Sequence, residues 1–176
     1  MVHRYGKDVF RFARSQLPSS QDAEDVFQET FRTLFERGRS FIDEADAKRW
    51  LFATASNHCK HFYRTAKRKG ATPLDPTDPV KWVRGKTTMT IYQGEPYYDS
   101  YHDVWDEVNK LSPAPREAMY LYYVEDYSID EIAEITHSNP TAVRVRLHRA
   151  RRKLKLAMQE RRINGSGTIS PGNAFD

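Results

Sequence analysis

Apolar residues recur at helical spacing in three segments of the first 69 residues. Positions i, i+4, i+7 and i+8 carry one apolar stripe in each segment, which predicts helices with one buried face. The first stripe is Tyr5, Val9, Phe12 and Ala13. The second stripe is Phe27, Phe31, Leu34 and Phe35. The third stripe is Leu51, Ala55, His58 with Cys59, and Phe62.

Polar residues and glycine mark the ends of the second of these helices. Ser19 and Ser20 offer N-caps just before Asp22, an acid that favours the positive end of a helix dipole. Gly38 follows the last apolar position and is expected to end the helix.

The periodicity stops between residues 70 and 103, where prolines and glycines interrupt it, so we expect a linker. The linker holds more aromatic residues than a plain spacer, which predicts an extended segment that docks on a partner. These aromatic residues are Trp82, Tyr92, Tyr97, Tyr98 and Tyr101. A helical pattern resumes at about Val104 and runs to about Arg161, and residues 162–176 have the composition of a disordered tail.

Helix boundaries are sharpest between residues 112 and 154. Ser112-Pro113 and Asn139-Pro140 each form an N-cap followed by proline at the first helical position. Ser128 and Glu131 fit the capping box S-x-x-E at the start of a short helix. Two helices separated by the brief turn THSN, the second far more basic than the first, match the helix-turn-helix plan.

The last helix combines an apolar stripe with an opposite face that carries no acid. The stripe is Val143, Leu147, Ala150 and Leu154. The first turns of such a helix can meet base edges in the major groove, where Arg pairs with guanine and Val meets a thymine methyl. Arg151, Arg152, Lys153 and Lys155 are expected to meet phosphates. The alternative is a charged surface helix; the caps, the turn and the acid-free face together favour DNA reading.

The charge pattern supports two contacts with a polyanion, although the formal net charge is only +4. Seven Lys/Arg and no acid lie between Asp46 and Asp75, and the same is true between Glu134 and Glu160. In the third helix Asn57, His61, Arg64 and Arg68 share one line, with Lys60 beside it. Aromatic residues interleaved with these cations suit unpaired bases, although a core role for the rings is also open.

An acidic face marks the second helix, where Asp25, Glu29, Arg32 and Glu36 share one line. It suits either a basic protein partner or the helix dipole, and the residues alone leave the two open.

Several function classes are excluded by what the sequence contains. His58, Cys59 and His61 lack a further ligand cluster, so we expect no metal site, and no signature indicates a cofactor or catalysis. No apolar run is long enough for a membrane span, and the start lacks a signal-peptide core. A single cysteine fits a reducing cytoplasm.

Three segments resemble the extracytoplasmic-function (ECF) sigma factors of bacterial RNA polymerase. They are DAEDVFQETF at 22–31, RWLFATASNHCKHFYR at 49–64, and LSPAPREAMYLYYVEDYSIDEIAEI with TAVRVRLHRARRKL between 111 and 154. The resemblance implies an all-α, non-enzymatic protein of two small helical domains on a flexible linker. Sigma region 2 would cover residues 1–69, the linker 70–103, the region 4 helix-turn-helix 104–161 and the tail 162–176.

The resemblance also implies partners and site residues. The protein would bind core RNA polymerase and promoter DNA, be restrained by an anti-sigma factor, and act in the cytoplasm. Residues at positions that bind the core polymerase in the family are Asp25, Gln28 and Glu29. Residues at minus-10-reading positions are Asn57, Lys60, His61 and Arg64, and a flipped base would enter a pocket near residues 39–43. Residues at minus-35-reading positions are Thr141, Arg144, Val145, His148, Arg149 and Arg152.

The chain departs from the family pattern where the recognition helix starts. Thr141-Ala142 replaces the usual glycine-threonine, and Val145 replaces a small polar residue, so the promoter sequence cannot be copied from relatives. Two other functions remain in view. One is a helix-turn-helix regulator whose N-terminal part senses a ligand or dimerises, and the other, more remote, is a nuclease with a metal at His58 and His61.

Overall fold

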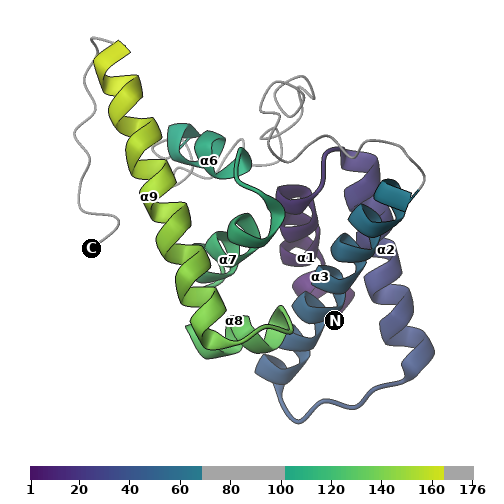
Figure 1. Cartoon of the computed structure of the whole chain (residues 1–176). Coiled ribbons are helices and arrows are strands. Elements are labelled where there is room, and N and C mark those ends of the chain that lie inside the picture. The colour runs from purple at the N-terminus through teal and green to yellow at the C-terminus, as the bar shows by residue number, and fades with distance from the viewer. Residues whose placement is uncertain (69–101, 165–176) are drawn as a thin grey trace.

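The computed structural model describes residues 1–68 and 102–164, and these residues form helices and no strand (Figure 1). We refer to residues 1–68 as the N-terminal half and to residues 102–164 as the C-terminal half. The expected linker, its aromatic residues and most of the expected tail lie outside the described residues.

The N-terminal half contains α1 (Val2–Gln16), α2 (Ser20–Arg37) and α3 (Glu44–Arg68), which pack against one another. Its first apolar stripe is fully buried, as predicted, with Val9 and Phe12 at its centre. The predicted ends of α2 are confirmed: the Ser19 hydroxyl accepts a hydrogen bond from the backbone N–H of Asp22, and Gly38 adopts the left-handed conformation with φ 54°.

The C-terminal half contains α6 (His102–Asn109), α7 (Pro113–Tyr123), α8 (Ile129–Ile135) and α9 (Pro140–Asn164). The capping box is present, with Ser128 and Glu131 bonded reciprocally. Asn139 Oδ1 accepts a hydrogen bond from the N–H of Ala142 and so caps α9. The predicted stripe of α9 is buried in full, which holds the helix against α6, α7 and α8.

The two halves lie side by side and share one core, because α7 packs on α1 and α8 packs on α3 (Figure 1). An aromatic cluster forms the centre of this inter-half interface. Phe12 and Phe52 of the N-terminal half contact each other edge to face, and Phe12 meets Tyr120 while Phe52 meets Tyr127. The rings of Phe12 and Phe52 are completely buried as a result.

One member of the predicted stripe of α2 is exposed. Phe35 is 72% exposed, whereas Phe31 and Leu34 are buried. Residues four apart are 400° apart around a helix of 3.6 residues per turn, so a line of such residues drifts by about 40° at each step. Phe31 therefore lies at the edge of the buried face, and Phe35, a further 40° round the helix, falls outside it, whereas Leu34 lies within that face beside Thr30.

Among the described helices, none is both long enough and apolar enough to span a bilayer.

The contact of His58 on α3 with α2 makes the free energy of unfolding depend on pH. His58 is half-buried beside α2, with its Nε2 atom 3.3 Å from Thr33 Oγ1, and burial lowers its pKa. The unfolded chain then binds a proton more readily than the folded one, so stability is lost as the pH falls below about 6.5. His58→Gln should therefore reduce the loss of unfolding free energy between about pH 7.5 and about pH 5.5. The measurement is urea unfolding at several pH values.

The matched control for this experiment is His61→Gln, which replaces an exposed histidine of the same helix. An identical pH dependence in wild type and His58→Gln would contradict the assignment.

Candidate nucleic-acid interface

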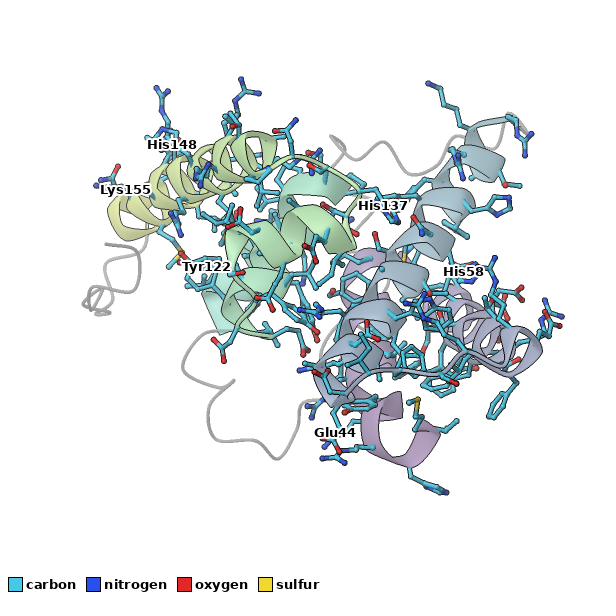
Figure 2. All side chains as sticks on the ribbon, turned by 90° about the horizontal axis from the view of Figure 1, so that it is seen from below. Glu44, His58, Tyr122, His137, His148 and Lys155 are labelled. Carbon is cyan, nitrogen blue, oxygen red and sulfur yellow. The ribbon has the colours of Figure 1, made fainter. Side chains whose placement is uncertain are left out.

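The exposed side of α9 gathers the six residues predicted to read the minus-35 element. Their spacing is i, i+3, i+4, i+7, i+8 and i+11, which places them on one face of a helix. All six are exposed: Thr141, Arg144, Val145, His148, Arg149 and Arg152. We call this set the α9 face. His148 and, further along, Lys155 lie on the part of α9 far from α3 (Figure 2).

The start of α9 is positioned by the turn that precedes it. His137 adopts a left-handed conformation with φ 51°, and the N–H of Ser138 donates to the carbonyl of Ala133. Arg146, on the flank of the α9 face, donates to Ser138 Oγ and ties the helix back to the turn. The turn thus aims the first turns of α9 outward, as DNA reading requires.

Arg151, which was expected to meet phosphates, contacts two tyrosine side chains of α7. Its Nε atom donates to the Tyr123 hydroxyl at 2.8 Å, and its guanidinium lies over the rings of Tyr122 and Tyr123. The side chain packs α9 onto α7. Arg152 and Lys153 beside it are exposed, as expected for phosphate contacts.

The predicted minus-10 residues also share one face of their helix, at i, i+3, i+4 and i+7 of α3. We call Asn57, Lys60, His61 and Arg64 the α3 face. Asn57, His61 and Arg64 are exposed and Lys60 is half-buried, and Asn57 and Lys60 also contact the C-terminal half. Asn57 Nδ2 lies 3.2 Å from His137 Nε2, and Lys60 Nζ donates to the carbonyl of Thr136 at 2.9 Å. Figure 2 shows His137 beside α3.

Three ion pairs surround the aromatic cluster, and α3 supplies the cation of each. These pairs are Lys48–Glu125 at 2.9 Å, Arg49–Glu131 at 3.6 Å and Lys60–Glu117 at 3.8 Å. Burial raises the pKa of Glu117 and of Glu125, against the opposing effects of Lys60 and Lys48. Glu131 is more exposed, and its hydrogen bonds with Ser128 lower its pKa.

Arg116 joins the halves from the inside and is only 1% exposed. Its guanidinium donates to the carbonyl of Gln16, the last residue of α1, and to the carbonyl of Asn109, the last residue of α6. The Tyr63 hydroxyl donates to the same Gln16 carbonyl at 2.6 Å, and burial raises the pKa of Tyr63 to about 12. Carbonyls at the C-terminal end of a helix lack hydrogen-bond donors within that helix, and here Arg116 and Tyr63 provide the donors.

The roles of Arg116 and of the acids of the inter-half interface were not predicted from the sequence. A signal was present, because Arg116 and Tyr120 are four residues apart and share a face of α7 that is otherwise apolar. A charged residue on an apolar face indicates a buried polar contact, but the pattern does not say which helix supplies the partner.

The loop between α2 and α3 presents apolar and aromatic side chains to solvent. Ile42 is 95% exposed, and Phe41 packs on Trp50 with the guanidinium of Arg39 over its ring. These residues lie where the resemblance places the pocket for a flipped base.

The acidic face of α2 lies open. Asp25 and Gln28 are exposed, and Glu29, which is half-buried, pairs with Arg32. Gln21 Nε2 donates to Asp25 at 3.4 Å. Within the described residues nothing covers the outward carboxylate of Asp25, so it is accessible to a protein partner.

The histidine and cysteine residues of α3 do not converge. Cys59 is buried and burial raises its pKa, whereas His61 faces solvent. Across residues 1–68 and 102–164, no three His, Cys, Asp or Glu side chains are grouped as a metal site requires.

Comparison with known proteins agrees with this arrangement. The model of the family "Sigma-70 region 2" matches residues 1–69, and that of "Sigma-70, region 4" matches residues 101–154. The ECF RNA polymerase sigma factor SigM of Bacillus subtilis is 29% identical over 91% of this chain and 93% of its own length. The RNA polymerase sigma factor CarQ of Myxococcus xanthus is 28% identical over 89% and 86%.

A solved structure has the same fold. The sigma factor RpoE of Bartonella quintana, in complex with the anti-sigma factor NepR, matches with a TM-score of 0.62 at 20% identity and covers 90% of this chain and 94% of its own. Two family models in the expected order, relatives matched over nearly their full length and a shared fold lead to one conclusion: the chain belongs to the ECF RNA polymerase sigma factors, which direct promoter recognition and transcription initiation.

Proposed function

We propose that this sigma factor reads the minus-35 element with the α9 face and the minus-10 element with the α3 face, while α2 binds core RNA polymerase. The observation that carries the proposal is the α9 face itself, six exposed residues on one side of a capped helix that carries no acid there. Residues 1–69 and 104–161 would act as the two DNA-binding units, joined by residues 70–103 and followed by the tail 162–176.

The α9 face divides by chemistry into base-reading and phosphate-binding parts. Arg144 and Arg149 can each make a bidentate contact with guanine, and Val145 offers a methyl surface to thymine. Thr141 and His148 add hydrogen-bonding groups to the same face. Arg152 lies a further turn along, where a cation binds phosphate and supplies affinity without sequence preference.

The α3 face and the loop before it would read the minus-10 element as single strand. Asn57 and His61 offer hydrogen bonds, and Lys60 and Arg64 offer charge. Capture of a flipped base at residues 39–43, beside Trp50, would offset the unstacking cost of a few kcal/mol.

We assign core polymerase binding to Asp25, Gln28 and Glu29 on α2, because these residues form an accessible acidic face on a helix that belongs to neither DNA-reading face. By analogy with the complex of RpoE and NepR, we propose that an anti-sigma factor restrains this chain as well. No cofactor or catalytic step is needed for this role, and its place of action is the cytoplasm, where chromosome and polymerase meet.

In vitro transcription with purified core enzyme tests the proposed function. Start sites mapped across a genomic library should share a minus-10 and a minus-35 element. A gel shift with and without core enzyme distinguishes the alternative: an ordinary helix-turn-helix regulator would bind duplex DNA strongly and specifically by itself.

Arg144→Ala should weaken recognition of the minus-35 element by about 1–3 kcal/mol and relax the base preference at one position, since a bidentate contact is lost. Arg152→Ala is the matched control, and it should weaken binding evenly across sequences and lower the salt slope by about one. Run-off transcription from single-base promoter variants measures both. Unchanged selectivity in Arg144→Ala would remove this residue from the base-reading set.

Arg151→Ala should lower the free energy of unfolding by about 1–2 kcal/mol, because it loses a hydrogen bond and contacts with two tyrosine rings. Arg152→Ala should stay within about 0.5 kcal/mol of wild type. Urea unfolding followed by circular dichroism compares the two variants. Equal stability of Arg151→Ala and wild type would contradict the packing role.

Asp25→Lys should weaken association with core polymerase by at least about tenfold, since a like charge replaces an attractive one. The control Glu134→Lys makes the same charge change at an exposed position of α8. Pull-down of core enzyme at graded concentrations measures both, and duplex minus-35 binding should be unaffected by Asp25→Lys. Equal capture of core enzyme by the two variants would show that Asp25 lies outside the docking surface.

A further inference from the structure

The first two turns of α9 carry a strip of alkyl groups on their outer side. Thr141, Ala142 and Val145 lie at i, i+1 and i+4, so Thr141 and Ala142 are both neighbours of Val145 on the helix surface. Thr141 and Val145 are exposed, and Ala142 is half-buried. We call these three residues the methyl strip, because each side chain presents at least one methyl group.

Val145 is the most apolar residue of the strip, and the fold gives no reason for it. Its side chain is 40% exposed, whereas Val143 and Leu147 on the opposite side of α9 are buried in the core. A β-branched residue also favours a helix less than most polar residues with straight side chains, since its χ1 angle is restricted there. An exposed valine at this position therefore adds neither to the core nor to the stability of α9.

The strip is held in a fixed orientation by the cap of α9. Asn139 Oδ1 accepts a hydrogen bond from the N–H of Ala142 at 2.8 Å, and the carbonyl of Asn139 accepts one from the N–H of Val143. A valine in a helix populates one χ1 rotamer almost exclusively. The methyl groups of Val145 thus lose little conformational entropy when they contact a ligand.

The chemistry of the strip fits one feature of the major groove. Thymine presents a C5-methyl group there, and the side chains that contact it are apolar ones such as alanine and the methyl end of threonine. Phosphates, by contrast, attract cations and polar groups, so alkyl side chains do not suit the sequence-independent part of the contact. Arg144 and Arg149 flank the strip and can anchor it to guanine on either side.

The strip is long enough to meet two thymines. Thr141 and Val145 are four residues apart, which is about 6 Å along a helix that rises 1.5 Å per residue. Base pairs of B-DNA follow one another at about 3.4 Å. The methyl groups that these two side chains reach are therefore about two base pairs apart or closer.

We propose that the methyl strip makes this sigma factor select thymine methyl groups in the minus-35 element, at two positions within about two base pairs of each other. This inference rests on the assignment of the α9 face to the minus-35 element. It is particular to this chain, because Thr141, Ala142 and Val145 are the residues at which the recognition helix departs from the family pattern.

Replacement of single thymines by uracil tests the proposal. Uracil keeps the pairing with adenine and the O4 acceptor of thymine, and it lacks only the methyl group. The probe is a fluorescent promoter fragment whose minus-35 element has been mapped by transcription, and the full-length protein is bound to core polymerase. Uracil should weaken binding about fourfold at each of the two positions and leave the other positions unchanged. Equal affinity for thymine and uracil throughout the element would overturn the proposal.

Val145→Ser assigns the methyl effect to the strip. Serine and valine have similar helix propensity, but serine has no methyl group, so thymine and uracil should bind equally at one of the two positions. The control Leu156→Ser removes another exposed alkyl side chain of α9, outside the α9 face, and should keep both responses to uracil. Circular dichroism checks that both variants are folded. Undiminished responses at both positions in Val145→Ser would contradict a role for this residue.

A cytosine analogue gives the converse measurement on the wild-type protein. Where cytosine replaces a uracil-sensitive thymine, 5-methylcytosine restores the methyl group at the same place in the major groove. Wild type should bind the 5-methylcytosine fragment about fourfold more tightly than the cytosine fragment. Val145→Ser should bind the two equally at its own position. Equal binding of both fragments by wild type would count against methyl recognition.

Transcription separates failure of this inference from failure of the proposed function. If wild type with core polymerase initiates at promoters that share a minus-35 element, yet does not respond to uracil in that element, the methyl strip is rejected and the promoter-reading role stands. If wild type initiates nowhere, the proposed function is wrong and methyl recognition falls with it.

Discussion

The packing of the two halves depends on the hydrogen bonds made to the last carbonyl groups of α1 and α6. The last carbonyls of a helix have no partner within it, and here Gln16 is buried and Asn109 half-buried, so both carbonyls need partners from the protein. The Arg116 guanidinium donates to both and places its positive charge at the negative ends of two helix dipoles. Burial lowers the pKa of Arg116, and the neighbouring Tyr63 and Glu117 oppose that effect only in part.

Arg116 also explains why the interface is polar at its edges and aromatic at its centre. The guanidinium fixes α7 against the end of α1, and Phe12 then meets Tyr120 one turn of α7 further on. With α7 in place, α8 lies along α3, where Lys48 lies within cation–π distance of Phe52 and Tyr127 and pairs with Glu125. Among the pairing cations of α3, Lys60 is also a proposed minus-10 residue, so the same side chain would serve both the packing of the halves and DNA.

The helices could be predicted from local chemistry, whereas the packing between the two halves could not. Caps at Ser19, Ser128 and Asn139 act within four residues, so the sequence revealed them, and the buried stripe of α9 followed from its period. The family resemblance supplied the roles of the α3 and α9 faces, which no spacing could give. The exposure of Phe35 was not foreseen because an i, i+4 line drifts around the helix, and the contact of Arg151 with Tyr123 was not foreseen because α7 supplies it. Thr136 and Glu117, the partners of Lys60 in the other half, lie more than 50 residues away, and periodicity carries no information about such contacts.

Positive charge on α3 takes part in two attractions. A substitution that adds positive charge near Lys60 would strengthen attraction to a DNA strand, but it would equally strengthen attraction to Glu117 and so hold the two halves together more tightly. Packing of the halves and affinity for the minus-10 strand therefore rise together when the change is made on α3. Changes at Glu117, Glu125 or Glu131 alter the contact between the halves without altering a residue of either DNA-reading face.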